Sequence, residues 1–258
     1  MRQLIKSFSL GGLLFAGVLG MACQRADVSA ADPVQMLQDM EKILRGKSHS
    51  MTAAMDVKTE SGTRGYQFKI WMEGADKAFV RVIHPAKVEG QGYLRLQSRL
   101  WNYKPTAARA ILIPTSMMHD RFMDSDFSND DFMKMSYLPR DYTPSILGRE
   151  LLEGIELFRL ELKPKKEAQV RYRKLIFLLR AADWMPVRTE YYNEKLEHIR
   201  TLEYSEVRDF SGHPMPSVWQ MTDHREKGRL TTLTIQEAQF NTPIPETYFS
   251  RENLEKYP

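Results

Sequence analysis

The sequence predicts a mainly β protein with a few helices (α+β), built on a curled antiparallel sheet. Three observations predict it: runs in which apolar and polar residues alternate, turn residues between those runs, and a central segment without alternation. Alternation with a period of two gives a sheet with one apolar and one solvated face, which is typical of antiparallel pairing. Ten or more strands do not stay flat, so we expect the sheet to curl toward a barrel.

A helix is expected over residues 33–45. Asp32 is a typical N-cap, Pro33 suits the first helical position and Gly46 is a typical C-cap. Between these positions apolar residues recur at spacings of three and four, namely Val34, Leu37, Met40 and Leu44. The pattern predicts an amphipathic helix whose apolar face lies against the sheet.

Strands are expected wherever the period changes to two. In the first half these runs are 51–57, 66–72, 78–82, 93–96, 100–103 and 109–113. In the second half they are 155–162, 172–179, 186–192, 199–207, 217–223 and 229–238. Turn residues such as Ser61-Gly62 separate them, and residues 245–254 read as a last short helix or turn that packs on the edge of the sheet.

Residues 115–148 interrupt this pattern with a cluster of methionine and phenylalanine. We expect short helices joined by turns that form a lid over one opening of the curled sheet. The same spacing also suits an ordinary core, but methionine is flexible and polarisable, so such a surface can repack around ligands of varying shape. The candidate lid residues are Met117, Met118, Phe122, Met123, Phe127, Phe132 and Met133.

The N-terminal thirty residues are expected to be a signal peptide, which leaves residues 31–258 as a single domain exported to the periplasm. Arg2 and Lys6 precede an apolar, glycine-rich stretch over residues 10–22, and Val28-Ser29-Ala30 forms a small-x-small cleavage site. Cys23 leaves an alternative open. It is the one cysteine and lies at the end of the apolar stretch, so a form lipidated at Cys23 would be anchored to a membrane.

Chemical motifs point away from catalysis. The chain has no GxSxG elbow, no HExxH and no glycine-rich phosphate loop, and its six histidines are scattered. Basic and acidic residues interleave, which does not favour nucleic acid as a partner. We therefore expect no enzyme activity, no cofactor and no metal.

An acidic cluster resembles the start of an EF-hand loop, because Asp124, Asp126, Ser128 and Asp130 alternate. The sixth position lacks glycine and the twelfth, Met135, lacks the bidentate glutamate, so the calcium-binding pattern fails. A helix that begins near Asp130, capped by Ser128 or Asn129, explains the cluster better.

Several segments together resemble the LolA-like outer-membrane lipoprotein-sorting proteins, as a divergent branch. They are residues 70–74 (IWMEG), 77–81 (KAFVR), 85–87 (PAK), 90–95 (GQGYLR), 100–105 (LWNYKP), 109–114 and 125–131. The resemblance implies an unclosed barrel of about eleven strands with helices that cap a cavity for acyl chains. It also implies an arginine that holds the lid closed, a role that we assign to neither Arg81 nor Arg95.

The function expected from these observations is a periplasmic carrier that binds acyl chains and sorts lipoproteins to the outer membrane. An inner-membrane transporter and an outer-membrane acceptor would be its partners. The alternative is an envelope sensor or adaptor, or a lipid-binding accessory protein of an envelope transporter, that uses the same fold. On the strands, the expected cavity residues are Trp71, Phe79, Trp101 and Tyr103, although Trp71 would face outward if Ile70 and Met72 face inward.

Overall fold

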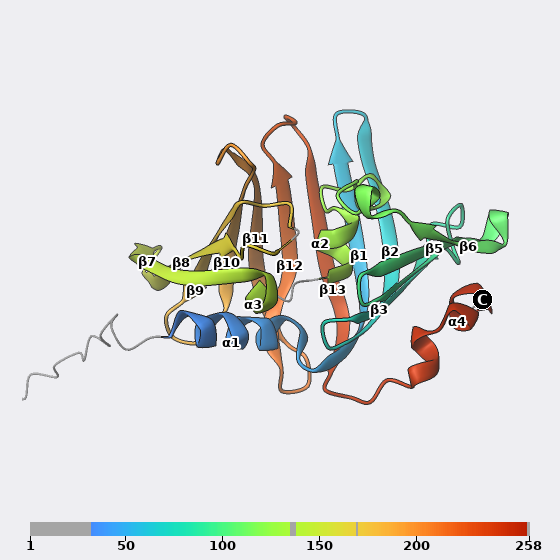
Figure 1. The fold of residues 1–258 in the computed structure, drawn as a ribbon, viewed down its shortest axis with the longest axis horizontal. Helices are drawn as coiled ribbons and strands as arrows, with labels where there is room; N and C mark the ends of the chain where they lie inside the picture. The colour runs from blue at the N-terminus through green and yellow to red at the C-terminus, as the bar shows by residue number, and fades with distance from the viewer. Residues whose placement is uncertain (1–31, 135–137, 169, 257–258) are drawn as a thin grey trace, which may run out of the picture. The chain divides into compact units, whose positions relative to one another are not determined.

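Thirteen antiparallel strands form one sheet in the described part of the chain, which comprises residues 32–134, 138–168 and 170–256 of a computed structural model (Figure 1). The predicted signal peptide and Cys23 lie outside these residues. In chain order the strands are β1 (Ser48–Thr59), β2 (Gly62–Glu73), β3 (Lys77–His84), β4 (Gly92–Leu96), β5 (Arg99–Lys104), β6 (Arg109–Ile113), β7 (Tyr142–Leu152), β8 (Ile155–Pro164), β9 (Lys174–Arg180), β10 (Pro186–Tyr192), β11 (His198–Asp209), β12 (Pro214–Asp223) and β13 (Leu230–Phe240).

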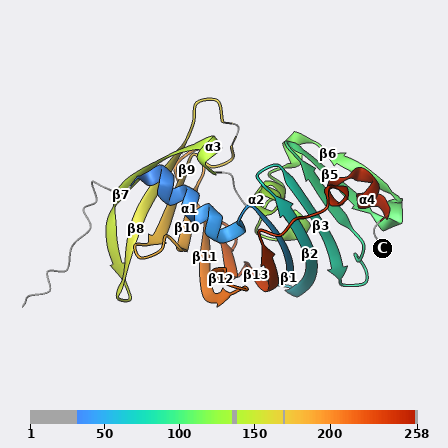
Figure 2. The same ribbon diagram turned by 90° about the horizontal axis from the view of Figure 1, so that it is seen from below.

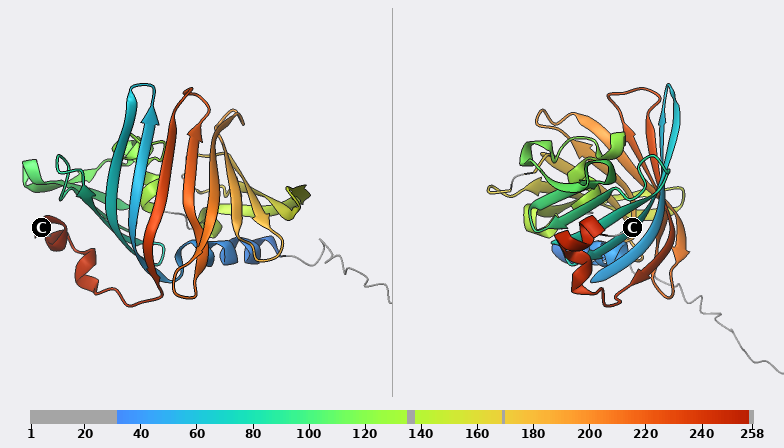
Figure 3. Two further views of the ribbon diagram at one scale, coloured as in Figure 1. Left: turned by 180° about the vertical axis from the view of Figure 1, so that it is seen from behind. Right: turned by 90° about the vertical axis from the view of Figure 1, so that its right-hand side faces the viewer.

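The strand order makes the sheet a continuous meander that stays open. It runs β6-β5-β4-β3-β2-β1-β13-β12-β11-β10-β9-β8-β7, so the first and last strands of the chain pair in the middle (Figure 3). The two edges are β6 and β7, which are consecutive in sequence but are not paired with each other. The predicted unclosed antiparallel sheet is therefore confirmed, while the expected number of about eleven strands is wrong.

Strand β7 is the element that the sequence reasoning missed, because residues 142–148 were included in the expected lid. Pro144 and Gly148 disguise it: proline is excluded from central strands, and Gly148 marks a register shift in the pairing with β8. β7 is an edge strand, so the missing N–H of Pro144 is tolerated there.

The helices are short except for the first. They are α1 (Pro33–Arg45), α2 (Asn129–Lys134), α3 (Leu138–Asp141) and α4 (Arg251–Lys256), with single 3₁₀ turns η2 (Pro105–Ala107), η3 (Thr115–Met117), η4 (Phe122–Asp124) and η5 (Glu246–Phe249). None of the helices in the described residues is long and apolar enough to cross a bilayer.

The caps of α1 are those expected from the sequence. The Asp32 carboxylate accepts a hydrogen bond from the Val34 N–H at 2.9 Å, and Gly46 ends the helix with a φ of 59°. Met36, Leu37, Met40 and Leu44 are buried. The helix crosses one end of the sheet beneath β7 to β12, as the view from below shows (Figure 2).

The sheet has two differently covered faces. We call the face that carries Phe68, Ile70 and Val80 the inner face; it shares a large apolar cluster with α1 and with the segment between β6 and β7. We call the face that carries Phe79 and Leu94 the outer face; it shares a smaller cluster with the C-terminal segment. Because neighbouring residues on a strand point to opposite faces, the clusters are separated by the sheet itself.

Candidate functional site

The connection between the two sheet edges lies over the inner face. Residues 114–141, which we call the crossing segment, leave β6 at one edge and enter β7 at the other (Figure 1). Every other consecutive pair of strands is joined through adjacent positions in the sheet. The open topology therefore requires this one connection to span the opening.

Aromatic side chains hold the described part of the crossing segment against the sheet. The Phe122 and Phe132 rings stack with their centroids 3.9 Å apart. Phe132 lies 5.5 Å from Phe68 of β2, and Phe122 lies 4.8 Å from Tyr93 of β4. All four side chains are buried, so this contact is a packed apolar interface.

The other expected lid residues divide by exposure. Phe127, Met118 and Met133 are buried in the same cluster, and Met123 packs against it with a φ of 49°. Met117 is 47% exposed. The crossing segment therefore directs most of its predicted apolar residues toward the inner face.

The four strand residues expected to line the same cavity lie on the outer face instead. Trp71, Phe79, Trp101 and Tyr103 form a separate cluster that the C-terminal residues Ile244, Phe249 and Leu254 cover. Ile70 and Met72 face inward, so Trp71 faces outward, as alternation requires. The structure thus brings the lid residues together and separates the strand aromatics from them.

A pocket opens between the crossing segment, the C-terminal end of α1 and the strands β7 and β9 to β13. It has a volume of about 100 Å³ within about 880 Å³ of empty space that includes its mouth. Pockets that hold drug-sized ligands span roughly 300–1,000 Å³, so a long chain enters only if side chains move aside. Apolar members of its wall are Leu44, Phe127, Phe132, Leu138, Val170, Leu175, Leu202, Trp219 and Leu233.

Asp131 connects the wall of this pocket to the crossing segment. Its carboxylate accepts hydrogen bonds from the Tyr172 hydroxyl at 3.0 Å and from the Arg200 guanidinium at 3.3 Å. Arg200 is 1% exposed and also donates to the Tyr172 hydroxyl and to Asp223 of β12. The buried guanidinium is therefore matched by carboxylates from a strand and from the crossing segment.

The same carboxylate caps helix α2. The Ser128 hydroxyl accepts a hydrogen bond from the Asp131 N–H, and the Asp131 carboxylate accepts one from the Ser128 N–H, both at 3.0 Å. This reciprocal pair is a capping box, and it confirms that Ser128 caps the helix expected at this position. Asp131 thus fixes the local fold and the contact with the sheet together.

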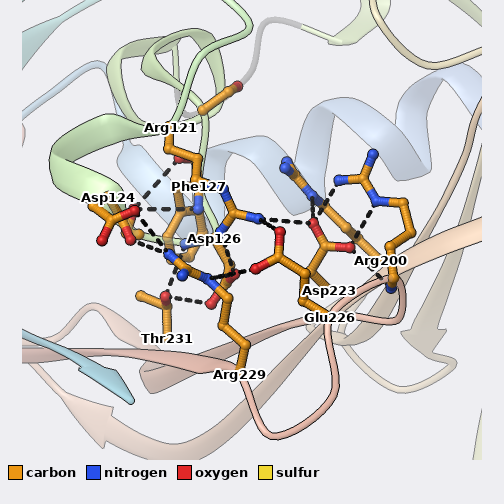
Figure 4. A network of polar contacts seen from close by, with 12 residues as sticks. Arg121, Asp124, Asp126, Phe127, Arg200, Asp223, Glu226, Arg229 and Thr231 are labelled. Carbon is orange, nitrogen blue, oxygen red and sulfur yellow. Dashed lines mark hydrogen bonds and ion pairs between the residues drawn. The ribbon is translucent and has the colours of Figure 1, made fainter. Parts of the chain in front are cut away.

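A second set of ion pairs holds the crossing segment at residues 121–126 (Figure 4). The Asp126 carboxylate, which is fully buried, accepts from Arg121 at 3.0 Å, from Arg229 at 2.8 Å and from the Thr231 hydroxyl at 2.6 Å. Asp124 pairs with Arg64 of β2 and with Arg229. The acidic cluster that resembled a calcium loop is therefore bound by arginines of the sheet and its hairpin.

Asp223 joins this network to Arg200. Burial raises the pKa of the Asp223 carboxyl, but the hydrogen bonds from Arg225 and the charges of Arg200 and Arg225 outweigh burial and lower the pKa below its usual range. Arg121 lies 3.7 Å from the same carboxylate. Asp223 therefore stays ionised. Its carboxylate pairs with Arg121 of the crossing segment and with Arg200 and Arg225.

Arg81 and Arg95 donate to main-chain carbonyls. Arg81 is buried on the outer side, where it donates to carbonyls of Gly90, Asn253 and Leu254. The Arg95 guanidinium donates to the carbonyl of Ala75 at 2.7 Å. Arginines that contact the crossing segment include Arg64 of β2, Arg171 before β9, Arg200 of β11 and Arg229 at the end of the β12–β13 hairpin.

Sequence reasoning missed Arg200, Asp223 and Arg229 because they act only through contacts between distant parts of the chain. One signal was available for Arg200. It shares a strand face with Leu202 and Tyr204, so alternation places a charged residue on the apolar face. A charge at such a position requires a buried partner.

Comparisons with known proteins agree with this architecture. A family model described as "-like: Uncharacterized protein" matches residues 74–256. A DUF1329 family protein from Desulfovibrio piger is similar over 87% of this chain and 100% of its own, with a TM-score of 0.78 and 22% identity. A putative outer-membrane lipoprotein-sorting protein domain from Vibrio parahaemolyticus is similar over 87% and 98%, with a TM-score of 0.76 and 22% identity.

A LolA superfamily protein from Nitrosomonas europaea is similar over 86% of this chain and 99% of its own, with a TM-score of 0.75 and 19% identity. No curated protein matches the sequence. The open sheet with its crossing segment is thus a LolA-like fold. The chain belongs to the family that the matching family model describes, and its fold is that of the LolA-like structures.

Proposed function

We propose that the protein is a periplasmic carrier of lipids or lipoproteins that binds acyl chains on the inner face, beneath the crossing segment. The observation that supports this proposal is that the apolar and the charged side chains of the crossing segment make different contacts. Its phenylalanine and methionine side chains fill the inner face, while its aspartates and Arg121 form ion pairs with the sheet and its hairpin. An acyl chain can take the place of the apolar side chains.

Energetic considerations support a covered site for such a ligand. Each buried methylene is worth about 0.8 kcal/mol, so a sixteen-carbon chain gains roughly 12 kcal/mol on leaving water. The small pocket means that this chain must displace side chains of the crossing segment, which reduces the net gain. A carrier requires this reduction, because it has to release its cargo.

Location in the cell envelope is part of the proposal. The predicted signal peptide over residues 1–30 and the similarity to a lipoprotein-sorting domain both support it. Intact mass of the protein isolated from cells tests it. Cleavage after Ala30 gives a soluble form, whereas a diacylglyceryl mass on a chain that begins at Cys23 gives the anchored alternative. An unprocessed chain contradicts export.

Direct binding is tested by native mass spectrometry of gently purified protein and by uptake of a fluorescent fatty acid. We expect co-purified acyl species and saturable uptake. Absence of both would contradict the carrier proposal.

A reversible lock tests where the chain enters. Asp126→Cys with Thr231→Cys, in a Cys23→Ser background, places a disulfide between the crossing segment and β13, whose side chains now lie 2.6 Å apart. The oxidised protein should exclude the fatty acid and the reduced protein should take it up. Equal uptake by both forms would mean that the crossing segment does not have to move.

The adaptor alternative has one observation in its favour. Ile111, Leu112 and Met117 at one edge of the sheet, and Leu147 and Leu151 at the other, are all about half exposed or more. Exposed apolar residues beside an unpaired strand edge can bind a protein. Ile111→Lys with Leu112→Glu should abolish capture of a stoichiometric envelope partner if this function holds, and should leave acyl uptake unchanged if the carrier proposal holds alone.

A further inference from the structure

One end of the pocket beneath the crossing segment is lined by aromatic rings. Tyr142, Tyr172, Tyr191, Tyr204 and Trp219 all contribute to its wall. The Tyr172 and Tyr191 rings lie 4.7 Å apart, and Tyr204 meets Trp219 edge to face at 5.5 Å. Packing of an acyl chain does not require aromatic walls, since aliphatic side chains supply the same apolar surface. Arg171 lies over the Tyr172 ring at 5.6 Å, which shows that a cation is accommodated against this aromatic wall, and the faces of the other rings offer the same chemistry to a ligand.

One hydroxyl in this wall has no hydrogen-bond partner among the described residues. Tyr142 donates to the Tyr172 carbonyl, Tyr172 donates to Asp131, and the Tyr204 hydroxyl lies 3.4 Å from that of Thr189. Tyr191 lacks such a contact, although burial raises the pKa of its hydroxyl well above the usual value. Its ring and hydroxyl are therefore the groups most readily offered to a ligand.

Carboxylates outnumber cations on the wall at this end of the pocket, although arginines pair with Asp131 and Asp141. Asp130, Asp131 and Asp141 contribute to the wall, against one cation, Arg171. The Arg200 guanidinium lies 3.3 Å from the Asp131 carboxylate, and the Arg140 guanidinium lies 3.2 Å from the Asp141 carboxylate. The charges act differently on different rings. Burial and then Asp131, Asp141 and Asp130 raise the pKa of Tyr142, whereas at Tyr191 burial and Asp131 raise the pKa and Arg200 lowers it.

We infer that this end of the pocket binds the ammonium head group of an amphiphilic ligand whose acyl chain lies beneath the crossing segment. A quaternary or primary ammonium interacts favourably with the faces of tyrosine and tryptophan rings, and more so when it is partly desolvated. Nearby carboxylates add to this attraction and oppose an anionic head group. The inference rests on the proposed function and specifies its substrate class as amine-bearing lipids.

Four twelve-carbon probes with different head groups test the inference. Dodecyltrimethylammonium, dodecylphosphocholine, dodecyl maltoside and dodecanoate are titrated below micelle formation against the protein carrying a neutral fluorescent acyl reporter. We expect the ammonium probe to displace the reporter about fivefold more tightly than the maltoside, as the magnitude of a partly desolvated cation–π contact implies. Dodecanoate should bind more weakly than the maltoside.

Variants identify the groups responsible. Tyr191→Leu, and Asp130→Asn with Asp141→Asn, should each bring the affinity for the ammonium probe close to that for the maltoside, whereas Tyr191→Phe keeps the ring and should retain the preference for ammonium. Asp56→Asn, an exposed carboxylate on β1 outside the pocket, is the matched control.

The outcomes separate the two proposals. If no probe binds, including the maltoside, the carrier proposal itself fails. If the maltoside and dodecanoate bind as tightly as the ammonium probe, acyl binding stands and the head-group inference is overturned. A preference that survives Tyr191→Leu and the aspartate variants would also overturn it, because the preference would then arise elsewhere on the protein.

Discussion

The inner and outer faces of the sheet carry similar aromatic clusters but are covered in different ways. The crossing segment covers the inner face and is tied to the sheet mainly by side-chain ion pairs, such as those of Asp126 and Asp131. The C-terminal segment covers the outer face, where Arg81 donates to its main-chain carbonyls. Both covers bury phenylalanine, so apolar contact alone does not distinguish them.

The difference bears on which cover would have to move under the proposed function. Charged side chains that separate at a surface regain hydration, and several of those at the crossing segment, including Arg121 and Asp124, are already partly exposed. Main-chain carbonyls that lose a buried guanidinium remain unsatisfied unless water reaches them. We therefore interpret the C-terminal segment as a permanent part of the fold and the crossing segment as the releasable cover.

The largest expected effect comes from breaking the outer cover. Arg81→Ala leaves the carbonyls of Gly90 and Leu254, now 2.5 and 2.9 Å from the guanidinium, without this donor. The free energy of unfolding should fall by about 3 kcal/mol, and the C-terminal segment should become sensitive to protease. Urea unfolding and limited proteolysis measure both. Arg99→Ala, at an exposed position of β5, is the control. An unchanged C-terminal segment in Arg81→Ala would contradict the assignment.

Asp126→Ala is expected to reduce stability less than Arg81→Ala does, and to speed the uptake of fatty acid. It removes the buried acceptor of Arg121, Arg229 and Thr231, but both arginines keep Glu226 nearby. We expect a loss of about 2 kcal/mol in the free energy of unfolding and faster fatty-acid uptake. Stopped-flow fluorescence measures the rate. Slower uptake would mean that the ion pairs assist entry instead of restraining it.

Dependence on pH should affect the inner cover alone. Burial raises the pKa of Glu41 to about 7, although Arg45 and the Leu138 N–H of the crossing segment oppose the shift. The folded state therefore binds this proton more tightly than the unfolded state, whose carboxyl titrates near 4.5. Stability from this group is present below about pH 4.5 and is lost as the pH rises to 7, by up to about 3 kcal/mol.

Glu41→Gln should flatten this slope in unfolding measured between pH 5 and 8, whereas Asp39→Asn, on the exposed side of the same helix, should not. Hydrogen exchange at residues 138–141 should respond to pH in the parent protein. The outer cover should not respond, because guanidinium and carbonyl groups do not titrate in this range. A response of the C-terminal segment would contradict the separation of the two covers.

The smallest effect is expected at Gly92. A Cβ at this position would lie 2.7 Å from the Leu254 side chain and 2.9 Å from Arg81. Leu254 and Arg81 are buried, so both side chains must shift slightly, and Gly92→Ala should cost about 1 kcal/mol and raise the rate of tail proteolysis slightly. Gly65→Ala, whose nearest contact would be 3.1 Å, provides the comparison. An equal effect at both glycines would mean that C-terminal docking is not the cause.

Periodicity in the sequence predicted most of this fold. It succeeded for features that depend on residues close together in the chain. The caps of α1, the alternation in β1 to β3 and the capping of α2 by Ser128 all follow from neighbouring residues. Alternation even required Trp71 to face away from Ile70. It could not say which face the crossing segment covers, since that depends on the order of strands in space. For the same reason the aromatics of β3 and β5 were assigned to the wrong face.

The strand order has a mechanical consequence. The crossing segment is covalently fixed to both edges of one sheet, β6 and β7, so it has no free end to swing open. The contour length of the segment sets the greatest distance between those edges. It therefore limits how far the sheet can uncurl. A ligand that moves the two edges apart therefore pulls the crossing segment more tightly over the ligand. One that lifts the middle of the segment draws the edges together.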